Sequence, residues 1–273
     1  MRFLVFSLLL LLTSGCSASR TVWISVTDQL GMAKLMESIQ QSPVIFVGEF
    51  HDRTSHHDLQ LQIIKALEVK GVPLVIGLEM FDTESQPALT RWSSGDLTIE
   101  DFSRLYQQNW TIAWTEYDRI LLYARNRRIR LIGLNAPLDL VNRVSRYGWD
   151  SLRTEDKARL PVGVTPAIAD DYIEFLNASF GDHPMPTALF ANFCAAQGLR
   201  NNSMALQIKK ALVEYPGATV VVITGIGHAM RRGVAHALGP DLAARAKIVV
   251  PYEEGIFRHI SENDADYIIT EPE

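Results

Sequence analysis

The stretch Pro43-Val-Ile-Phe-Val47, which runs directly into Gly48-Glu-Phe-His51, decides the fold class of this chain. A short apolar run that ends at a glycine is typical of a strand buried on both faces. A second run, Ala218-Thr-Val-Val-Val-Ile-Thr224, ends in the same way in Gly225-Ile-Gly-His228. A glycine followed three positions later by a histidine therefore leaves a buried strand twice, which indicates one shared site.

Two further apolar runs also end in a glycine and then a polar residue. Val72-Pro-Leu-Val-Ile76 leads into Gly77-Leu-Glu79, and Ile129-Arg-Leu-Ile132 leads into Gly133-Leu-Asn135. A helical pattern over residues 55–67 separates the first two strands, and this spacing is typical of a βαβ unit with parallel strands. Because the carboxyl ends of parallel strands share one edge of the sheet, we expect the following side chains to converge: Glu49, His51, Glu79, Asn135 and His228.

The length and composition predict an α/β protein. The chain has 273 residues, of which 47% are hydrophobic and 21% charged, which is enough for a large core. We predict a mostly parallel β-sheet flanked by helices, built from residues 20–83, 129–137 and 215–273. Residues 84–128 and 138–214 have helical patterns, and we expect these two insertions to form a smaller all-helical domain.

The charge of the chain argues against one class of partner. The formal net charge is -5, and no block of lysine or arginine interrupts the sequence. Binding to phosphate backbones needs clustered cations. We therefore expect no nucleic-acid partner.

The first residues have the pattern of a bacterial lipoprotein signal. A positive Met1-Arg2 precedes an apolar stretch over residues 3–12 and then Thr13-Ser-Gly-Cys16. We expect residues 1–15 to be removed and Cys16 to carry a lipid anchor that tethers the protein to a membrane, although an ordinary secretory signal with an incidental Cys16 is the alternative. Cys194 is then the one thiol of the mature chain, so no intramolecular disulfide is expected, and its apolar neighbours predict burial.

The residue types at the predicted sheet edge suit a metal site. Two imidazoles, from His51 and His228, together with Glu49 and Glu79 could hold Mn, Fe, Co or Zn and leave a position open for water. Asp52 could orient His51 without contacting the metal itself, or it could neutralise Arg53. The alternative is structural, since either histidine could cap a helix or bond a backbone carbonyl. We expect His56 and His57 to be solvated residues of a first helical turn.

Aromatic residues gather in the first helical insertion. Their spacing of three or four residues usually indicates a core. Some of them could instead line a flat apolar slot for a planar ligand, with a tyrosine oxygen available to iron. These aromatic residues are Tyr106, Trp110, Trp114, Tyr117 and Tyr123.

Several ordered motifs together resemble the ChaN-like haem-binding lipoprotein family. They span nearly the whole mature chain and include Gly48-Glu-Phe-His-Asp52, Gly77-Leu-Glu-Met-Phe81, Asn135-Ala-Pro137, Arg200-Asn-x-x-Met-Ala205 and Gly225-Ile-Gly-His228. The resemblance implies a lipoprotein of haem and iron uptake, with a parallel sheet and a smaller helical domain. Ser17, after the lipidated cysteine, is compatible with outer-membrane sorting, and the protein would face the periplasm.

The resemblance also implies how haem is held. Members are described as homodimers that sandwich two cofacial haems, with one tyrosine on each iron and a histidine of the partner subunit on the propionates. No motif here matches that tyrosine, and the delivery partner leaves no trace in the sequence. The candidates on the helical part are Tyr106, Tyr117, Tyr123 and Tyr172, with His183 for the propionate contact.

The same strand-end residues resemble the wider Tiki/TraB group, which is associated with metal-dependent peptide hydrolysis. In that hypothesis His51 and His228 hold the ion and Glu49 or Glu79 activates water. Arg200 would steady a carboxylate or an oxyanion. We favour the haem carrier over the hydrolase.

Overall fold

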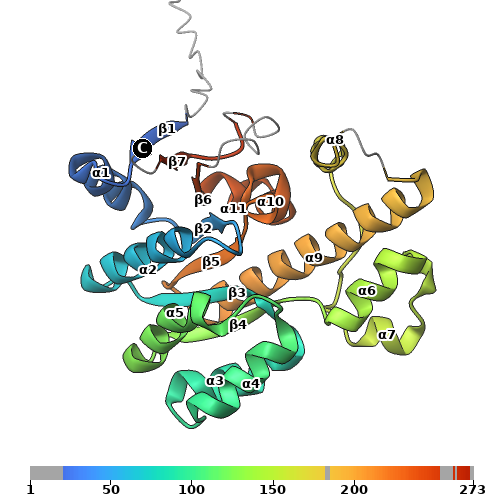
Figure 1. Cartoon of the computed structure of the whole chain (residues 1–273), viewed down its shortest axis with the longest axis horizontal. Coiled ribbons are helices and arrows are strands. Elements are labelled where there is room, and N and C mark those ends of the chain that lie inside the picture. Colours follow the sequence, from blue (N-terminus) through green and yellow to red (C-terminus); the bar gives the residue numbers. More distant parts are fainter. Residues whose placement is uncertain (1–20, 182–184, 253–260, 262, 271–273) are drawn as a thin grey trace, which may run out of the picture.

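The computed structural model describes residues 21–181, 185–252, 261 and 263–270, and its centre is a seven-stranded sheet (Figure 1). The strand order is β1-β7-β6-β2-β5-β3-β4, and every pairing among the described strands is parallel. The strands are β1 (Val22–Ser25), β2 (Val44–Glu49), β3 (Leu74–Asp82), β4 (Arg130–Asn135), β5 (Thr219–Gly225), β6 (Lys247–Pro251) and β7 (Tyr267–Thr270).

Eleven α-helices are present in the described part of the chain. They are α1 (Gln29–Ile39), α2 (Thr54–Val69), α3 (Gln86–Ser94), α4 (Ile99–Asn109), α5 (Trp114–Arg127), α6 (Leu138–Tyr147), α7 (Thr154–Ala158), α8 (Asp170–Ser179), α9 (Thr187–Glu214), α10 (Ile226–Ala229) and α11 (Pro240–Arg245). Within the residues that the structure describes, no helix has the length and apolar character needed to cross a membrane.

The predicted βαβ unit is present, and it explains why β2 and β3 are parallel. Helix α2 connects them and buries Leu59, Ile63 and Leu67, which recur every four residues along one face. It ends before Gly71, whose positive φ of 77° an L side chain rarely adopts. Strand β5 lies between β2 and β3 in the sheet. The α/β prediction is therefore confirmed.

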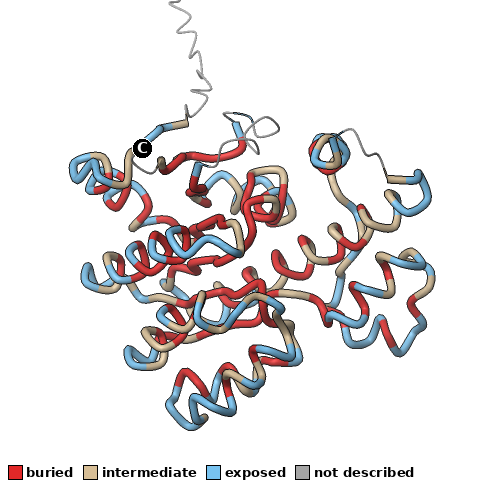
Figure 2. Tube along the Cα trace, viewed as in Figure 1, coloured by how far each residue is buried: buried red, intermediate tan, exposed pale blue. Residues whose placement is uncertain are grey.

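The two faces of the sheet belong to two apolar clusters. Alternate residues of β2 point in opposite directions, so Ile45 and Val47 pack on the face covered by α1 to α5. Val44 and Phe46 pack on the other face with residues of α8 to α10. Figure 2 shows the buried strands at the centre and exposed residues on the outer sides of the helices. A sheet covered on both faces explains its continuous apolar runs.

The two predicted helical insertions contribute to different clusters. Helices α3, α4 and α5 supply residues such as Trp92, Phe102 and Leu121 to the cluster on one sheet face. Residues of α6 and the middle of α9, including Leu140, Val144 and Leu199, form a third cluster, toward the right of Figure 1. The first insertion thus packs on one face of the sheet, whereas part of the second insertion packs on itself.

Candidate functional site

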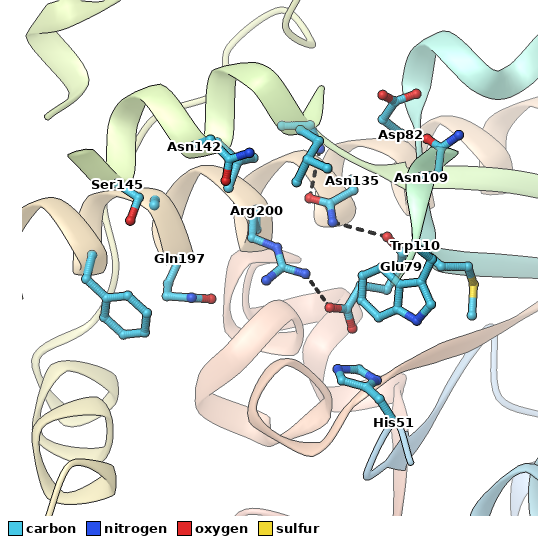
Figure 3. A pocket seen from close by; sticks show the side chains of 16 residues that line it. His51, Glu79, Asp82, Asn109, Trp110, Asn135, Asn142, Ser145, Gln197 and Arg200 are labelled. Atoms are coloured by element: carbon cyan, nitrogen blue, oxygen red, sulfur yellow. Dashed lines mark hydrogen bonds and ion pairs between the residues drawn. The ribbon is translucent and has the colours of Figure 1, made fainter. Parts of the chain in front are cut away.

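Four neighbouring strands bring the candidate residues to one edge of the sheet. In the order β2-β5-β3-β4, three of these strands end at Glu49, Gly225 and Asn135, and Glu79 lies three residues before the end of β3. His51 follows β2 by two residues, and His228 lies in α10 directly after β5. The predicted convergence is present, and Figure 3 shows His51 close to the Glu79 carboxylate.

Glu49 is buried and is held by side chains from two helices. Its Oε1 atom lies 2.7 Å from Nδ1 of His51 and also accepts a hydrogen bond from the Tyr117 hydroxyl. Its Oε2 atom accepts a hydrogen bond of 2.6 Å from Nε2 of Gln60. Nε2 of His57 lies 3.6 Å from the same oxygen. Both carboxylate oxygens therefore have protein partners.

Glu79 is buried in the same way, 2% exposed, and lies between buried apolar residues of β3. Arg200 of α9 forms an ion pair with Oε1, while the Thr224 hydroxyl and the backbone N–H of Gly225 donate to Oε2, the latter at 2.7 Å. Burial alone would raise the pKa of Glu79, but the Arg200 charge and the Thr224 hydrogen bond help to hold it well below its ordinary value. Glu79 is therefore ionised.

His228 is a neutral imidazole. Its Nδ1 atom lies 2.6 Å from the amide oxygen of Asn201, which can only accept, so Nδ1 carries the proton. Its Nε2 atom lies 3.7 Å from Oε1 of Glu79. Burial lowers the pKa of His228 to about 3, because the charged ring would lose its hydration.

The pKa of His51 shifts in the opposite direction to that of His228. Its side chain is 34% exposed, and burial opposes its protonation, but the hydrogen bond to Glu49 and the nearby charges of Glu79 and Glu49 raise the pKa of the ring. A Cβ atom at Gly225 would lie 3.0 Å from both Cε1 and Nε2 of this ring. The glycine therefore leaves the space that the imidazole occupies. Trp110 packs edge-on against it, with ring centroids 5.0 Å apart.

Two cavities open at this edge and share part of their walls. One, of about 400 Å³, lies between the ends of β3 and β4 and helices α6 and α9, and the other, of about 450 Å³, lies beside α8 and α10. Figure 3 shows the first. The residues that line both cavities are His51, Glu79, Gln197 and Arg200.

The predicted divalent metal centre is not supported. Among the described residues, no group of three or more His, Cys, Asp or Glu side chains has an arrangement that could hold a metal ion. The physical reason is that the Glu49 and Glu79 oxygens accept hydrogen bonds from protein donors, and that His228 directs its protonated Nδ1 at Asn201. The predicted residues converge, but they form two hydrogen-bonded networks, one around the Glu49 carboxylate and one around the Glu79 carboxylate.

The supporting residues were predicted with mixed success. Arg200 contacts Glu79 as expected, whereas Asn135 supports the strand end, donating to the Glu79 carbonyl oxygen at 3.1 Å. Asp52 is 74% exposed at its side chain and lies 4.0 Å from Arg53, which agrees with the alternative that it neutralises this arginine.

The prediction that His56 and His57 are solvated is wrong, since both side chains are buried. The first accepts a hydrogen bond from the Phe50 N–H, and the second contacts Glu49. Sequence reasoning missed four polar partners, of which Gln60 lies in the predicted helix over residues 55–67 and Asn201 lies in the quoted Arg200 motif. The other two, Glu116 and Thr224, have no motif.

The tyrosines proposed as haem ligands fit poorly. Tyr106, Tyr117 and Tyr172 are at most 1% exposed, which confirms a core position for the first two. Burial raises the pKa of all three, to about 12 for Tyr172, and so disfavours tyrosinate. Tyr123 donates to Glu68 at 3.1 Å, and burial and that bond raise its pKa. Cys194 is buried as predicted. Cys16, Ser17 and His183 lie outside the described residues.

Solved structures with a similar fold include a haem-binding protein and an esterase. The first, described as "Cofacial heme binding to ChaN of Campylobacter jejuni", has a TM-score of 0.67 and 15% identity and covers 86% of this chain and 90% of that one. The second, an erythromycin esterase mutant in its open conformation, has a TM-score of 0.52 and 11% identity and covers 82% and 73%. At these identities the likeness concerns the fold alone.

Sequence comparisons identify the family. A curated relative, Protein RETICULATA-RELATED 5, chloroplastic, from Arabidopsis thaliana, is 21% identical over 209 residues, and this chain spans only 28% of its length. A family model described as "Haem-binding uptake, Tiki superfamily, ChaN" matches residues 35–238, which include the complete strand-end site. The chain therefore belongs to the ChaN family of haem-binding uptake proteins within the Tiki superfamily.

Proposed function

We propose that this protein is a haem carrier of bacterial haem uptake, in which a tyrosine oxygen binds the iron and a dimer encloses the haem. Family membership supports haem as the ligand. The observation that carries the ligand assignment is the position of Tyr147, the last residue of α6, whose side chain is 71% exposed. It is the most exposed tyrosine of the chain, and its oxygen is open to an incoming iron.

The surroundings of Tyr147 suit a porphyrin, which has an apolar face and anionic propionates. Leu189 of α9 is 49% exposed and lies one turn before Asn192, whose amide donates to the carbonyl oxygen of Arg146 at 3.3 Å. The side chain of Arg146 is itself exposed and offers a cation for a propionate. Tyr147 would hold the haem through its phenolate oxygen, and the bound group would supply the iron that this oxygen binds.

The exposure of Tyr147 supports a dimer. Neither cavity at the sheet edge includes this residue, so a haem on Tyr147 has one face on this chain and the other toward solvent. A second copy with the same apolar surface would cover that face, and its contacts would bury Leu189 and the 50% exposed Leu138. We assign each chain one haem.

The haem carrier is tested by titrating the purified protein with haemin. We expect a tyrosinate-type absorption spectrum that saturates at one haem per chain, and Tyr147→Phe should remove that band. Tyr215→Phe is the matched control, because Tyr215 lies about 34 Å farther along α9 than Asn192, at 1.5 Å per residue. A band that survives Tyr147→Phe would contradict this ligand, and no band in the unmodified protein would contradict the carrier.

We further propose that the protein is anchored through Cys16 to the periplasmic face of the outer membrane. The support is the signal pattern over residues 1–16. Labelling of bacterial cells with radioactive palmitate should mark the full-length protein and leave Cys16→Ala unlabelled. Equal labelling of both would contradict the lipid anchor.

A further inference from the structure

The strand-end site has no role in the haem carrier, yet it has the parts of an acid–base centre. His51 uses Nδ1 to bond Glu49 at 2.7 Å, and among the described residues no protein group bonds Nε2. The ring lines both cavities, and Nε2 lies against Gly225. A carboxylate on one imidazole nitrogen fixes the tautomer and leaves the other nitrogen free to take a proton from water.

A buried chain of acidic and imidazole groups supports His51 from behind. Glu116 of α5 places Oε2 at 3.3 Å from Nδ1 of His57, and Nε2 of His57 lies 3.6 Å from Oε2 of Glu49. The Tyr117 ring is tilted by 40° against the His57 ring, with centroids 4.2 Å apart, and its hydroxyl donates to Glu49. Thr54 donates to Glu116 at 2.8 Å. The hydrogen bonds from Tyr117 and Gln60 fix the Glu49 carboxylate that orients His51, and His57 packs against it without forming a hydrogen bond among the described residues.

A fixed cation lies at the junction of the two cavities. The Arg200 side chain is 18% exposed and lines both cavities, while Glu79 holds its guanidinium in place. Thr224 and Gly225 in turn hold Glu79. A positive charge that is positioned before a reaction stabilises an oxyanion without the cost of reorganisation. Figure 3 shows this guanidinium pointing at the Glu79 carboxylate.

We propose that this chain hydrolyses a carboxylic ester at the junction of the two cavities without a metal ion, with His51 as the catalytic base and Arg200 as the stabiliser of the oxyanion. Glu49 is a positioning residue, supported by His57 and Glu116. This inference goes beyond the haem carrier and does not depend on it, since Tyr147 lines neither cavity.

The reaction needs only water as co-reactant. Nε2 of His51 takes one proton from water while the water oxygen forms a bond to the ester carbon, and the carbonyl electron pair moves onto the oxygen beside Arg200. That pair then returns, the bond from the ester carbon to the alcohol oxygen breaks, and the leaving oxygen takes the proton from His51. The products are one carboxylic acid and one alcohol, and the imidazole is neutral again.

The walls of the cavities indicate the kind of ester. The first cavity presents the amides of Asn109, Asn142 and Gln197, together with Trp110. The indole N–H of Trp110 is buried and has no acceptor among the described residues, so a substrate oxygen would satisfy it. The second cavity presents Phe50, Phe175 and Ile226. The substrate is therefore an ester with one hydrogen-bonding arm and one apolar arm.

The test uses 4-nitrophenyl acetate and butyrate with the haem-free, EDTA-dialysed full chain. We expect nitrophenolate release well above the buffer rate, and EDTA should not change this rate. In His51→Ala, kcat should fall by about 100-fold or more, which is the rate factor that a general base usually contributes. His236→Ala, at an exposed histidine, is the matched control and should keep the full rate. Added imidazole should restore part of the rate to His51→Ala.

Two outcomes would overturn the esterase. One is a rate that equals the buffer rate with both esters, and the other is a rate that His51→Ala leaves unchanged. A loss of activity in EDTA would overturn the metal-independent chemistry. Melting temperatures of the variants separate a folding defect from a catalytic one. His51→Ala should also keep the haem band, so failure of the esterase and failure of the carrier give different results.

The positioning role of Glu49 is tested separately, by measuring kcat and KM of two variants. Glu49→Gln keeps the size of the side chain but removes the charge that orients His51, so kcat should fall at least tenfold while KM stays within about twofold. His57→Gln should give a smaller fall of the same kind, because it acts one step farther away. A rise in KM with an unchanged kcat in either variant would contradict the positioning role.

Discussion

Two imidazoles at one sheet edge have opposite tendencies to ionise because their surroundings differ. His51 is partly exposed and bonds a carboxylate, so protonation is stabilised. His228 is enclosed, and its one protonated nitrogen already serves the amide of Asn201. The same residue type in the same glycine-histidine spacing therefore gives one proton acceptor and one neutral structural ring. No feature of the spacing distinguishes them.

The buried His228 predicts a loss of stability in acid. Its pKa is about 3 in the folded protein and about 6.5 in an unfolded chain. The unfolded state therefore binds more protons between these values, and the free energy of unfolding falls as the pH drops from about 6.5 toward 3, by about 1.4 kcal/mol per pH unit at most. Urea unfolding of His228→Gln at several pH values should show a flatter dependence, and the control His236→Gln should match the unmodified protein. An unchanged slope in His228→Gln would contradict this assignment.

Gly225 predicts a local packing effect. In Gly225→Ala the new methyl would stand 3.0 Å from the His51 ring, so the imidazole must move. We expect a loss of about 1–3 kcal/mol in the free energy of unfolding, as is usual for overpacking, and a fall in esterase kcat. Gly227→Ala, where the nearest atom would be 3.7 Å away, is the control for stability. Equal stability of both variants would argue against a close approach at Gly225.

At the scale of elements, one feature of helix α2 could be predicted from the sequence and another could not. Its apolar period correctly predicted the face toward the sheet. The first turn was predicted to be solvated, but α5 packs over it and brings Glu116 and Tyr117 to His57. Contacts between helices far apart in the sequence leave no periodic pattern.

Strand prediction depended on length and burial. The four apolar runs that end in a glycine correspond to β2, β3, β4 and β5, and the apolar run over residues 247–252 corresponds to β6. The missed strands, β1 and β7, have four residues each and lie at the edge or next to it. In so short a strand, the apolar pattern cannot be told from that of a loop. The strand-end acids were predictable because glycine marks the end of each run, whereas their hydrogen-bond partners come from other elements.

The buried face of α2 predicts a clear contrast in stability. Ile63 is fully buried, so Ile63→Ala should lower the free energy of unfolding by about 2–5 kcal/mol. Val69, on the last turn of the same helix, is 82% exposed, and Val69→Ala should change it by no more than about 0.5 kcal/mol. Urea unfolding measures both. Similar values for the two variants would contradict the packing of α2 on the sheet.

For the whole molecule, haem and assembly should be linked. Analytical ultracentrifugation should show that haemin converts the protein to a dimer, because the haem on Tyr147 needs a second apolar surface. Leu189→Asp should weaken that dimer, since a charge would enter the contact. Val213→Asp, at an exposed position near the far end of α9, is the matched control. A haem-loaded monomer would contradict the dimer while leaving the tyrosine ligand in place.

Helix α9 runs without interruption from the neighbourhood of Tyr147 to the guanidinium at the sheet edge. Asn192, which contacts the carbonyl of Arg146, and Arg200 are eight residues apart, or about 12 Å along the axis. Because one continuous helix carries both residues, a substitution that shifts α9 at Asn192 would also move Arg200 relative to His51.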